Sequence, residues 1–156
     1  MSDSYEEIVL GETILRRAPG ARHEAVCARL HARVTASLAC LATMRLLPPR
    51  SILQLATGTL VRPDLALLTA ATNKAWLLAE VVDSADHRTD TVVKKSLYED
   101  LRVPRLWMVD PRYDNVEVYH STQYGLALKQ ILAGKDVLRE ALIAEFQITM
   151  TELFNQ

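Results

Sequence analysis

The 156-residue chain has only two cysteines, and it lacks a long apolar run and an excess of charge of one sign. Cys27 and Cys40 lie thirteen residues apart in a stretch with a helical pattern. That separation is roughly 20 Å along a helix axis, which is too far for a disulfide between them. Two cysteines without nearby histidine partners do not make a zinc site either. Buried thiols in a reducing compartment are therefore expected.

No segment is apolar over the length that a membrane-spanning helix needs, so no membrane association is expected. The N-terminal sequence MSDSYEEIVLGETILRR starts with acidic and polar residues. It has no basic segment followed by an apolar run, which argues against a secretory signal. These absences predict a cytoplasmic protein.

Lysine and arginine number 18 against 19 for aspartate and glutamate, and the formal net charge is -1. Such a chain has no overall positive field, so any contact with nucleic acid must come from a local group of basic residues. A glycine-rich phosphate loop, a nucleophile elbow and a dinucleotide fingerprint are also missing. His23 and His31 do not form an HExxH pattern, which argues against a zinc protease, and His31 is expected on its helix surface.

Apolar residues make up 49% of the chain, which is ordinary for a globular protein. The length is that of one domain with a proper core, and the sequence has no internal repeat, low-complexity tract or Pro/Gly/Ser linker. Residues 1–156 are therefore expected to form a single domain.

The pattern of apolar residues predicts a mixed α/β arrangement. EEIVL and TILRR flank Gly11-Glu12 and predict an N-terminal β-hairpin. Apolar residues spaced by three or four predict an amphipathic helix over Arg22–Leu47, ending before Pro48-Pro49. Strands are expected at 51–56, 64–68 and 76–82, a second helix at 89–101, and further strands at 105–110, 115–120 and 121–132. This order favours a central mixed β-sheet flanked by helices, with a helical crossover.

Two carboxylates occupy unusual positions in the expected strands. Asp64 stands at the start of the apolar run DLALL, and Glu80 lies inside WLLAEVV. An isolated charge in so apolar a strand is costly unless something pairs with it. If the two strands are antiparallel neighbours, the carboxylates face one another, which a divalent cation such as Mg²⁺ would stabilise. The alternative is that Asp64 caps a turn and Glu80 forms a buried salt bridge with an arginine or lysine.

The helix expected at 89–101 carries polar residues at four-residue steps. Asp90, Lys94 and Tyr98 share one helical face. A lysine projected toward the two carboxylates would stabilise negative charge in the transition state of phosphodiester hydrolysis. The alternative is a helix cap followed by a modest surface ion pair, with Tyr98 packed against the sheet.

Three segments of the chain together resemble the Uma-two family of restriction-endonuclease-like proteins, within the PD-(D/E)XK nuclease superfamily. The segments are RPDLALL, LLAEVVDSADHRTDTVVKKSLYEDLRVPRLWMVDP and NVEVYH. The likeness extends to Gly11-Glu12, to RHE at 22–24 and to TELF near the C-terminus, so it covers nearly the whole chain. The combined spacing carries the resemblance, since a single PD or ExV pair would not.

The resemblance implies a restriction-endonuclease-like core in which Asp64 and Glu80 bind Mg²⁺ or Mn²⁺ and the Val81 carbonyl adds a ligand. The usual superfamily motif has lysine two residues after the glutamate, where this chain has Val82. Members of the family usually lack that lysine and are thought to supply it from the next helix, at the position that Lys94 matches and Lys95 does not. Glu24 matches an acidic residue that helps to position metal or water, and Asp90 and Tyr98 are expected to support the site.

These features predict a metal-dependent endonuclease that hydrolyses DNA. Three local arginines, Arg22, Arg62 and Arg88, are expected to contact phosphates. A homodimer is expected, with its interface on an edge strand or on the apolar C-terminal segment. The main alternative is an idle binding or regulatory module that keeps the nuclease fold, and a weaker one is hydrolysis of a small phosphoester.

Overall fold

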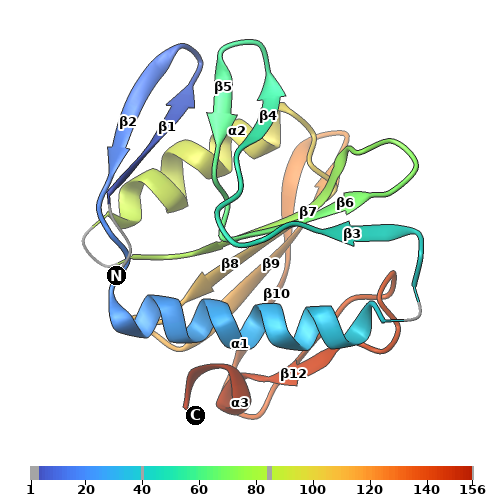
Figure 1. The fold of residues 1–156 in the computed structure, drawn as a ribbon. Coiled ribbons are helices and arrows are strands. Elements are labelled where there is room, and N and C mark those ends of the chain that lie inside the picture. Colours follow the sequence, from blue (N-terminus) through green and yellow to red (C-terminus); the bar gives the residue numbers. More distant parts are fainter. Residues whose placement is uncertain (1–3, 40, 84–85, 156) are drawn as a thin grey trace.

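The computed structural model describes residues 4–39, 41–83 and 86–155, and its centre is a six-stranded mixed sheet (Figure 1). The strand order is β10-β9-β8-β7-β6-β3, and only β7 and β8 run parallel. The strands are β3 (Met44–Leu46), β6 (Leu65–Thr69), β7 (Ala75–Val81), β8 (Arg105–Asp110), β9 (Asn115–Thr122) and β10 (Gly125–Ala133). This arrangement confirms the predicted α/β fold with a central mixed sheet.

Helices cover both faces of this sheet. Helix α1 (Ala21–Ser37) packs on one face, where Val26 and Leu30 share a core with Leu65 and Leu77. The crossover between the parallel strands covers the other face and consists of a π-helical turn, η1 (Thr89–Lys94), followed by α2 (Lys95–Asp100). Since alternate residues of a strand point to opposite faces, the side chains of β7 divide between these two cores.

Two β-hairpins form a second, four-stranded sheet with the order β2-β1-β5-β4 (Figure 1). Its strands are β1 (Tyr5–Val9), β2 (Glu12–Arg16), β4 (Leu53–Ala56) and β5 (Thr59–Val61). Ile8 pairs with Leu60, and the Gly11 N–H donates to the Gly58 carbonyl at 2.8 Å. The expected N-terminal hairpin is thus confirmed, and it stands over the face that η1 and α2 cover.

The C-terminal segment packs on the core of its own chain. Its elements are β11 (Val137–Arg139), β12 (Gln147–Thr149) and α3 (Met150–Phe154). Thr149 and Glu152 form a capping box at the start of α3. Leu138, Phe146 and Phe154 are almost fully buried beside α1, and Phe146 stacks on a sheet residue, Trp107. The apolar C-terminal segment therefore packs on its own core and is not available as a dimer interface.

The predicted helix over Arg22–Leu47 is too long. Helix α1 ends at Ser37, and Met44–Leu46 forms the edge strand β3, paired with β6. The apolar spacing continues past the real end, but the pairing gives β6 a hydrogen-bonding neighbour that a longer helix could not provide. Cys40 lies outside the described residues.

In the described part of the chain, no helix has the length and apolar character needed to cross a membrane.

Candidate active site

The two predicted carboxylates lie opposite one another on antiparallel strands. Leu65 of β6 pairs with Ala79 of β7. In this antiparallel register the next position places Asp64 opposite Glu80. The Val81 N–H donates to Asp64 Oδ2 at 2.8 Å, which ties the two strands at this point. Asp64 is 3% exposed and Glu80 1%. The structure therefore brings Asp64, Glu80 and Val81 together as expected.

Lys94 is fully buried and lies between two carboxylates. Its Nζ is 2.8 Å from Glu80 Oε2 and 2.7 Å from Glu7 Oε2. Tyr98, one turn further along the crossover, donates its hydroxyl to the same Glu80 oxygen at 2.6 Å. Burial alone would lower the pKa of Lys94, but Glu80 and Glu7 outweigh that effect and raise it. Lys94 is a charged partner of the site and not the surface residue of the alternative interpretation.

The N-terminal hairpin supplies two charged residues that the sequence interpretation missed, Glu7 and Arg16. Arg16 donates to Glu7 Oε1 at 2.5 Å and to Asp90 Oδ1 at 2.8 Å. Glu7 Oε2 also accepts the Arg62 N–H at 2.6 Å. A signal was present, because Tyr5, Glu7 and Val9 alternate along β1 and this places Glu7 on the same side as Val9, which is in the core.

Six charged side chains form what we call the buried charge cluster, each less than a tenth exposed: Glu7, Arg16, Asp64, Glu80, Asp90 and Lys94. When all are ionised, the cluster itself has four carboxylates and two cations, and His23 and Arg50 lie beside Asp64 from outside it. Burial raises the pKa of Glu80 to about 8 and that of Asp90 to about 6, against the opposing effect of Lys94. The cluster therefore favours an added proton or an added cation.

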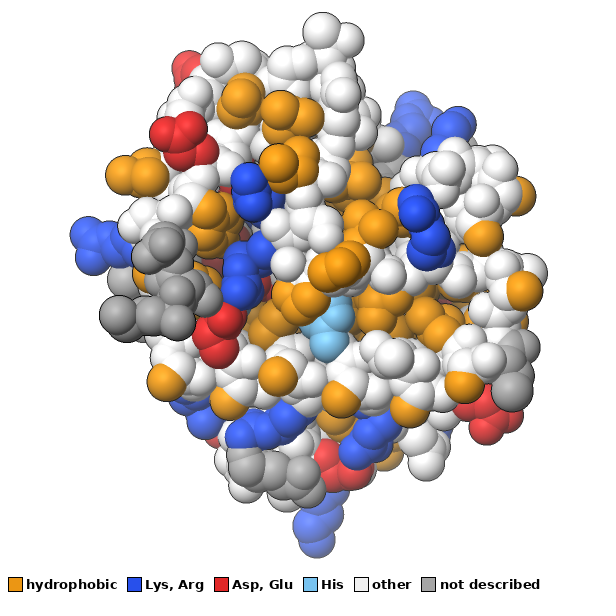
Figure 2. Space-filling model, in the orientation of Figure 1, with side chains coloured by type: hydrophobic (Ala, Val, Ile, Leu, Met, Phe, Trp, Pro, Cys, Tyr) orange, Lys and Arg blue, Asp and Glu red, His pale blue; other side chains and the backbone are white. Residues whose placement is uncertain are grey.

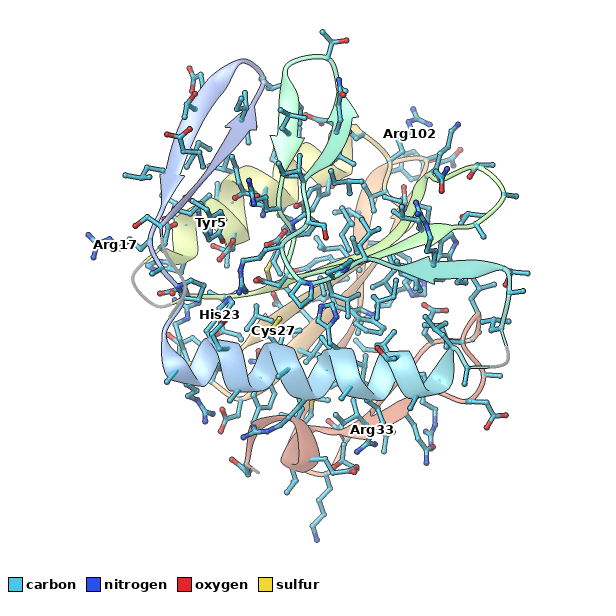
Figure 3. All side chains as sticks on the ribbon, viewed as in Figure 1. Tyr5, Arg17, His23, Cys27, Arg33 and Arg102 are labelled. Carbon is cyan, nitrogen blue, oxygen red and sulfur yellow. The ribbon has the colours of Figure 1, made fainter. Side chains whose placement is uncertain are left out.

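A second group of polar residues lies on the side of Asp64 toward α1. His23 Nε2 is 3.3 Å and Arg50 Nη1 3.5 Å from Asp64 Oδ1. Arg50 also pairs with Glu24 at 2.8 Å. Burial would lower the pKa of His23, but its hydrogen bond with Asp64 raises it. His23 and Cys27 point from α1 toward the sheet, as Figure 3 shows. Glu24 thus reaches the site through Arg50 and also through His23, whose Nδ1 is 3.4 Å from Glu24 Oε1.

The donor set fits a hard divalent cation. Asp64 Oδ2 is fixed by the Val81 N–H, whereas Oδ1 has only the two longer contacts. Asp90 Oδ2 is a buried oxygen with no hydrogen-bond partner among the described residues. No group of three or more His, Cys, Asp or Glu in the described chain is arranged to hold a metal. Mg²⁺ is usually held by one or two carboxylates together with waters and substrate oxygens, so the two opposed carboxylates suffice.

The phosphate-binding role expected for Arg22, Arg62 and Arg88 stays a prediction, and the structure places the three residues in different surroundings. Arg22 donates to Asp114 and to the Phe154 carbonyl, the latter at 3.2 Å, but it also lines a cavity of about 350 Å³ beside His23. Arg62 is half-buried and Arg88 is exposed.

The expectation that His31 lies on the helix surface is wrong. His31 is buried, and its Nε2 is 2.6 Å from the Asp64 carbonyl oxygen. The physical reason is its place on the apolar stripe of α1, four residues from the buried Cys27 and one from Leu30.

The fold is of the restriction-endonuclease-like type. The fold is similar to that of a solved protein described as "a putative nuclease belonging to DUF820 from Anabaena variabilis ATCC 29413", with a TM-score of 0.79. That likeness covers 96% of this chain and 89% of the other at 14% identity, so it concerns the fold alone. The model of the Uma2 family, described as "Putative restriction endonuclease", matches residues 2–151. The chain therefore belongs to the Uma2 family, as its sequence motifs predict. No curated protein matches it.

Proposed function

We propose that this protein is a metal-dependent endonuclease that hydrolyses phosphodiester bonds of DNA. The observation that supports it best is the pairing of Asp64 and Glu80 across β6 and β7 inside a cluster short of positive charge. A nuclease family implies a nucleic-acid substrate. DNA as the nucleic acid, cleavage within the strand and dependence on Mg²⁺ or Mn²⁺ belong to the proposal.

In this proposal Asp64 and Glu80 hold the cation, with the Val81 carbonyl as a further ligand. When bound, Mg²⁺ would neutralise charge on the scissile phosphate and lower the pKa of a coordinated water. Lys94, 2.8 Å from Glu80, favours the ionised form of that carboxyl and adds positive charge where the transition state is anionic. Tyr98 orients Glu80 through its hydroxyl, and Asp90 supports the hairpin through Arg16.

One observation favours the idle-module alternative. Lys94 is fully buried between Glu80 and Glu7, which is also the geometry of a structural ion pair. In an idle module the cluster would hold the hairpin on the core and bind no metal. The two functions differ in whether a divalent cation binds and whether DNA is cut.

Cleavage of supercoiled plasmid and of single-stranded DNA in Mg²⁺, Mn²⁺ or EDTA tests the proposal. Wild-type protein is expected to cut in the metal buffers and not in EDTA. Asp64→Ala removes a metal ligand, and Lys94→Ala removes the charge beside Glu80. Each is expected to lower the cleavage rate by roughly a hundredfold or more.

Two matched variants control for protein handling. Asp100→Ala removes an exposed carboxylate at the end of α2, and Lys95→Ala removes the lysine next to Lys94, whose Nζ lies 4.5 Å from the Tyr119 ring centroid. Both are expected to cut at the wild-type rate. Equal faint cutting by wild type and by Asp64→Ala would mean contamination and would leave the idle module as the better explanation.

We also propose that the protein acts in the cytoplasm as a homodimer. The C-terminal segment is buried on its own core, so we place the dimer interface on β10, an edge strand of the six-stranded sheet. Leu128 and Ile131 on this strand are 46% and 58% exposed. Light scattering after gel filtration is expected to give twice the chain mass, and Ile131→Asp is expected to give the mass of one chain.

A further inference from the structure

Arg50 is the cation of the site that remains accessible from outside. Its side chain is 17% exposed, whereas that of Lys94 is fully enclosed and that of Arg16 is 5% exposed. The Lys94 ammonium group is buried and contacts Glu7 and Glu80. Basic side chains gather on the face that Figure 2 shows, between the hairpins and the N-terminal half of α1. A substrate phosphate that approaches Asp64 from this side meets a guanidinium first.

Glu24 contacts the Arg50 guanidinium through one hydrogen bond and one close ion-pair approach. Arg50 Nη1 lies 2.8 Å from Glu24 Oε1, and Nη2 donates to Oε2 at 2.9 Å. A charged hydrogen bond of this kind orients a guanidinium and leaves its other N–H groups available. No described residue accepts a hydrogen bond from Arg50 Nε. The ion pair therefore orients the group without using all of its donors.

The backbone at Arg50 is held in an unfavourable conformation beside Asp64. Its φ is 55°, in the left-handed region that favours glycine. The Arg50 N–H donates to the Pro63 carbonyl at 3.1 Å, which fixes this turn next to the head of β6. Strain of this kind persists where the surrounding structure imposes it, and it gathers at functional sites.

We propose that Arg50 binds a phosphate of the nucleic-acid strand directly beside the cation held by Asp64 and Glu80, and that Glu24 is a positioning residue for Arg50. This inference rests on the proposed nuclease function and deepens it. It assigns the phosphate contact at the centre of the site to Arg50, a residue outside the three arginines expected from the sequence. It also changes the role of Glu24 from positioning metal or water to orienting the guanidinium.

The position of Arg50 predicts two effects of opposite sign for Arg50→Gln. Affinity for a short fluorescent DNA duplex, measured by anisotropy in Ca²⁺, is expected to fall on the order of tenfold. The slope of log affinity against log salt is expected to shrink by about 0.9, the value for one lost phosphate contact. Affinity for Mn²⁺ in a calorimetric titration without DNA is expected to rise a few fold, because a positive charge 3.5 Å from Asp64 Oδ1 is gone. A misfolded variant would lose both affinities.

Arg50→Gly distinguishes the effect of losing the guanidinium from an effect on the backbone conformation, and Arg45→Gln is a matched control. Arg50→Gly suits the left-handed φ, so it is expected to fold as well as wild type and still to lose DNA affinity like Arg50→Gln. Arg45→Gln removes an exposed guanidinium that contacts Asn73 Oδ1 at 2.8 Å, away from the carboxylates. It is expected to keep wild-type affinity for both DNA and Mn²⁺.

A double-mutant cycle tests the positioning role of Glu24. Glu24→Gln alone is expected to weaken DNA binding a few fold, because the guanidinium loses the carboxylate that orients it. In the Arg50→Gln background the same change is expected to have no further effect on DNA affinity. Additive losses would mean that Glu24 acts independently of Arg50 and would overturn this part of the inference.

The outcomes distinguish the inference from the proposed function. If wild type binds Mn²⁺ and cuts DNA while Arg50→Gln matches Arg45→Gln in DNA affinity and salt slope, the inference on Arg50 is wrong and the nuclease proposal stands. If wild type neither binds Mn²⁺ nor cuts DNA, the proposed function is wrong, and the inference on Arg50 falls with it. Loss of DNA affinity in Arg50→Gln with a gain in Mn²⁺ affinity supports both.

Discussion

A Glu7→Ala variant is expected to lose about 3–5 kcal/mol of unfolding free energy, the usual cost of removing one partner of a buried ion pair. Glu7 accepts from both Lys94 and Arg16, and all three are buried. Its removal takes a carboxylate from each cation and breaks the Glu7–Lys94 contact between hairpin and crossover, while the Arg16–Asp90 contact stays. The measurement is urea unfolding followed by circular dichroism, with wild type and variant compared at the same pH.

The neighbouring Glu6 gives a matched control. It lies on the same strand but points to the solvent. Glu6→Ala is therefore expected to change the unfolding free energy by no more than about 0.5 kcal/mol. A loss below about 1 kcal/mol in Glu7→Ala would show that the hairpin is not held by the cluster, and the description of Glu7 as a partner of Lys94 would be wrong.

Glu80→Gln is expected to separate stability from activity. Burial raises the pKa of Glu80 to about 8, so without metal the protonated carboxyl is populated near neutral pH, and glutamine has the same shape and charge as that form. The unfolding free energy without metal is therefore expected to stay within about 1 kcal/mol of wild type. Metal-dependent cleavage is expected to fall roughly a hundredfold or more, because an amide is a poor ligand for Mg²⁺.

The structural ion-pair alternative predicts the reverse for Glu80→Gln. If the role of Glu80 were to neutralise Lys94, losing its charge would cost about 3–5 kcal/mol of stability. Urea unfolding in EDTA, together with plasmid cleavage in Mg²⁺, measures both quantities on one protein preparation. A variant that is strongly destabilised and has unchanged cleavage would contradict the metal-site interpretation.

The main strands and the carboxylate pair were predictable because their signals are local. The apolar runs around Asp64 and Glu80 mark β6 and β7, and a short connection makes them antiparallel neighbours, so their register follows. The position of Lys94 came from the family resemblance, and the structure places its side chain at Glu80. The chemical roles of these residues stay proposals.

Contacts between distant parts of the chain escaped prediction. Glu7 and Lys94 are 87 residues apart, and nothing in either segment indicates that they meet. Arg50 depends on a left-handed backbone after two prolines, which composition does not reveal. The end of α1 at Ser37 also depends on a long-range event, the pairing of Met44–Leu46 with β6.

Calorimetric titration of Mn²⁺ and Mg²⁺ into the metal-free protein tests most directly whether the buried charge cluster is a cation site. Wild type is expected to bind a divalent cation at a single site near neutral pH and to release protons as Glu80 ionises. Asp64→Asn and Glu80→Gln are expected to give no binding heat above dilution. Absence of binding by correctly folded wild type, or equal binding by wild type and Glu80→Gln, would contradict the cation site and leave the cluster as a structural ion network.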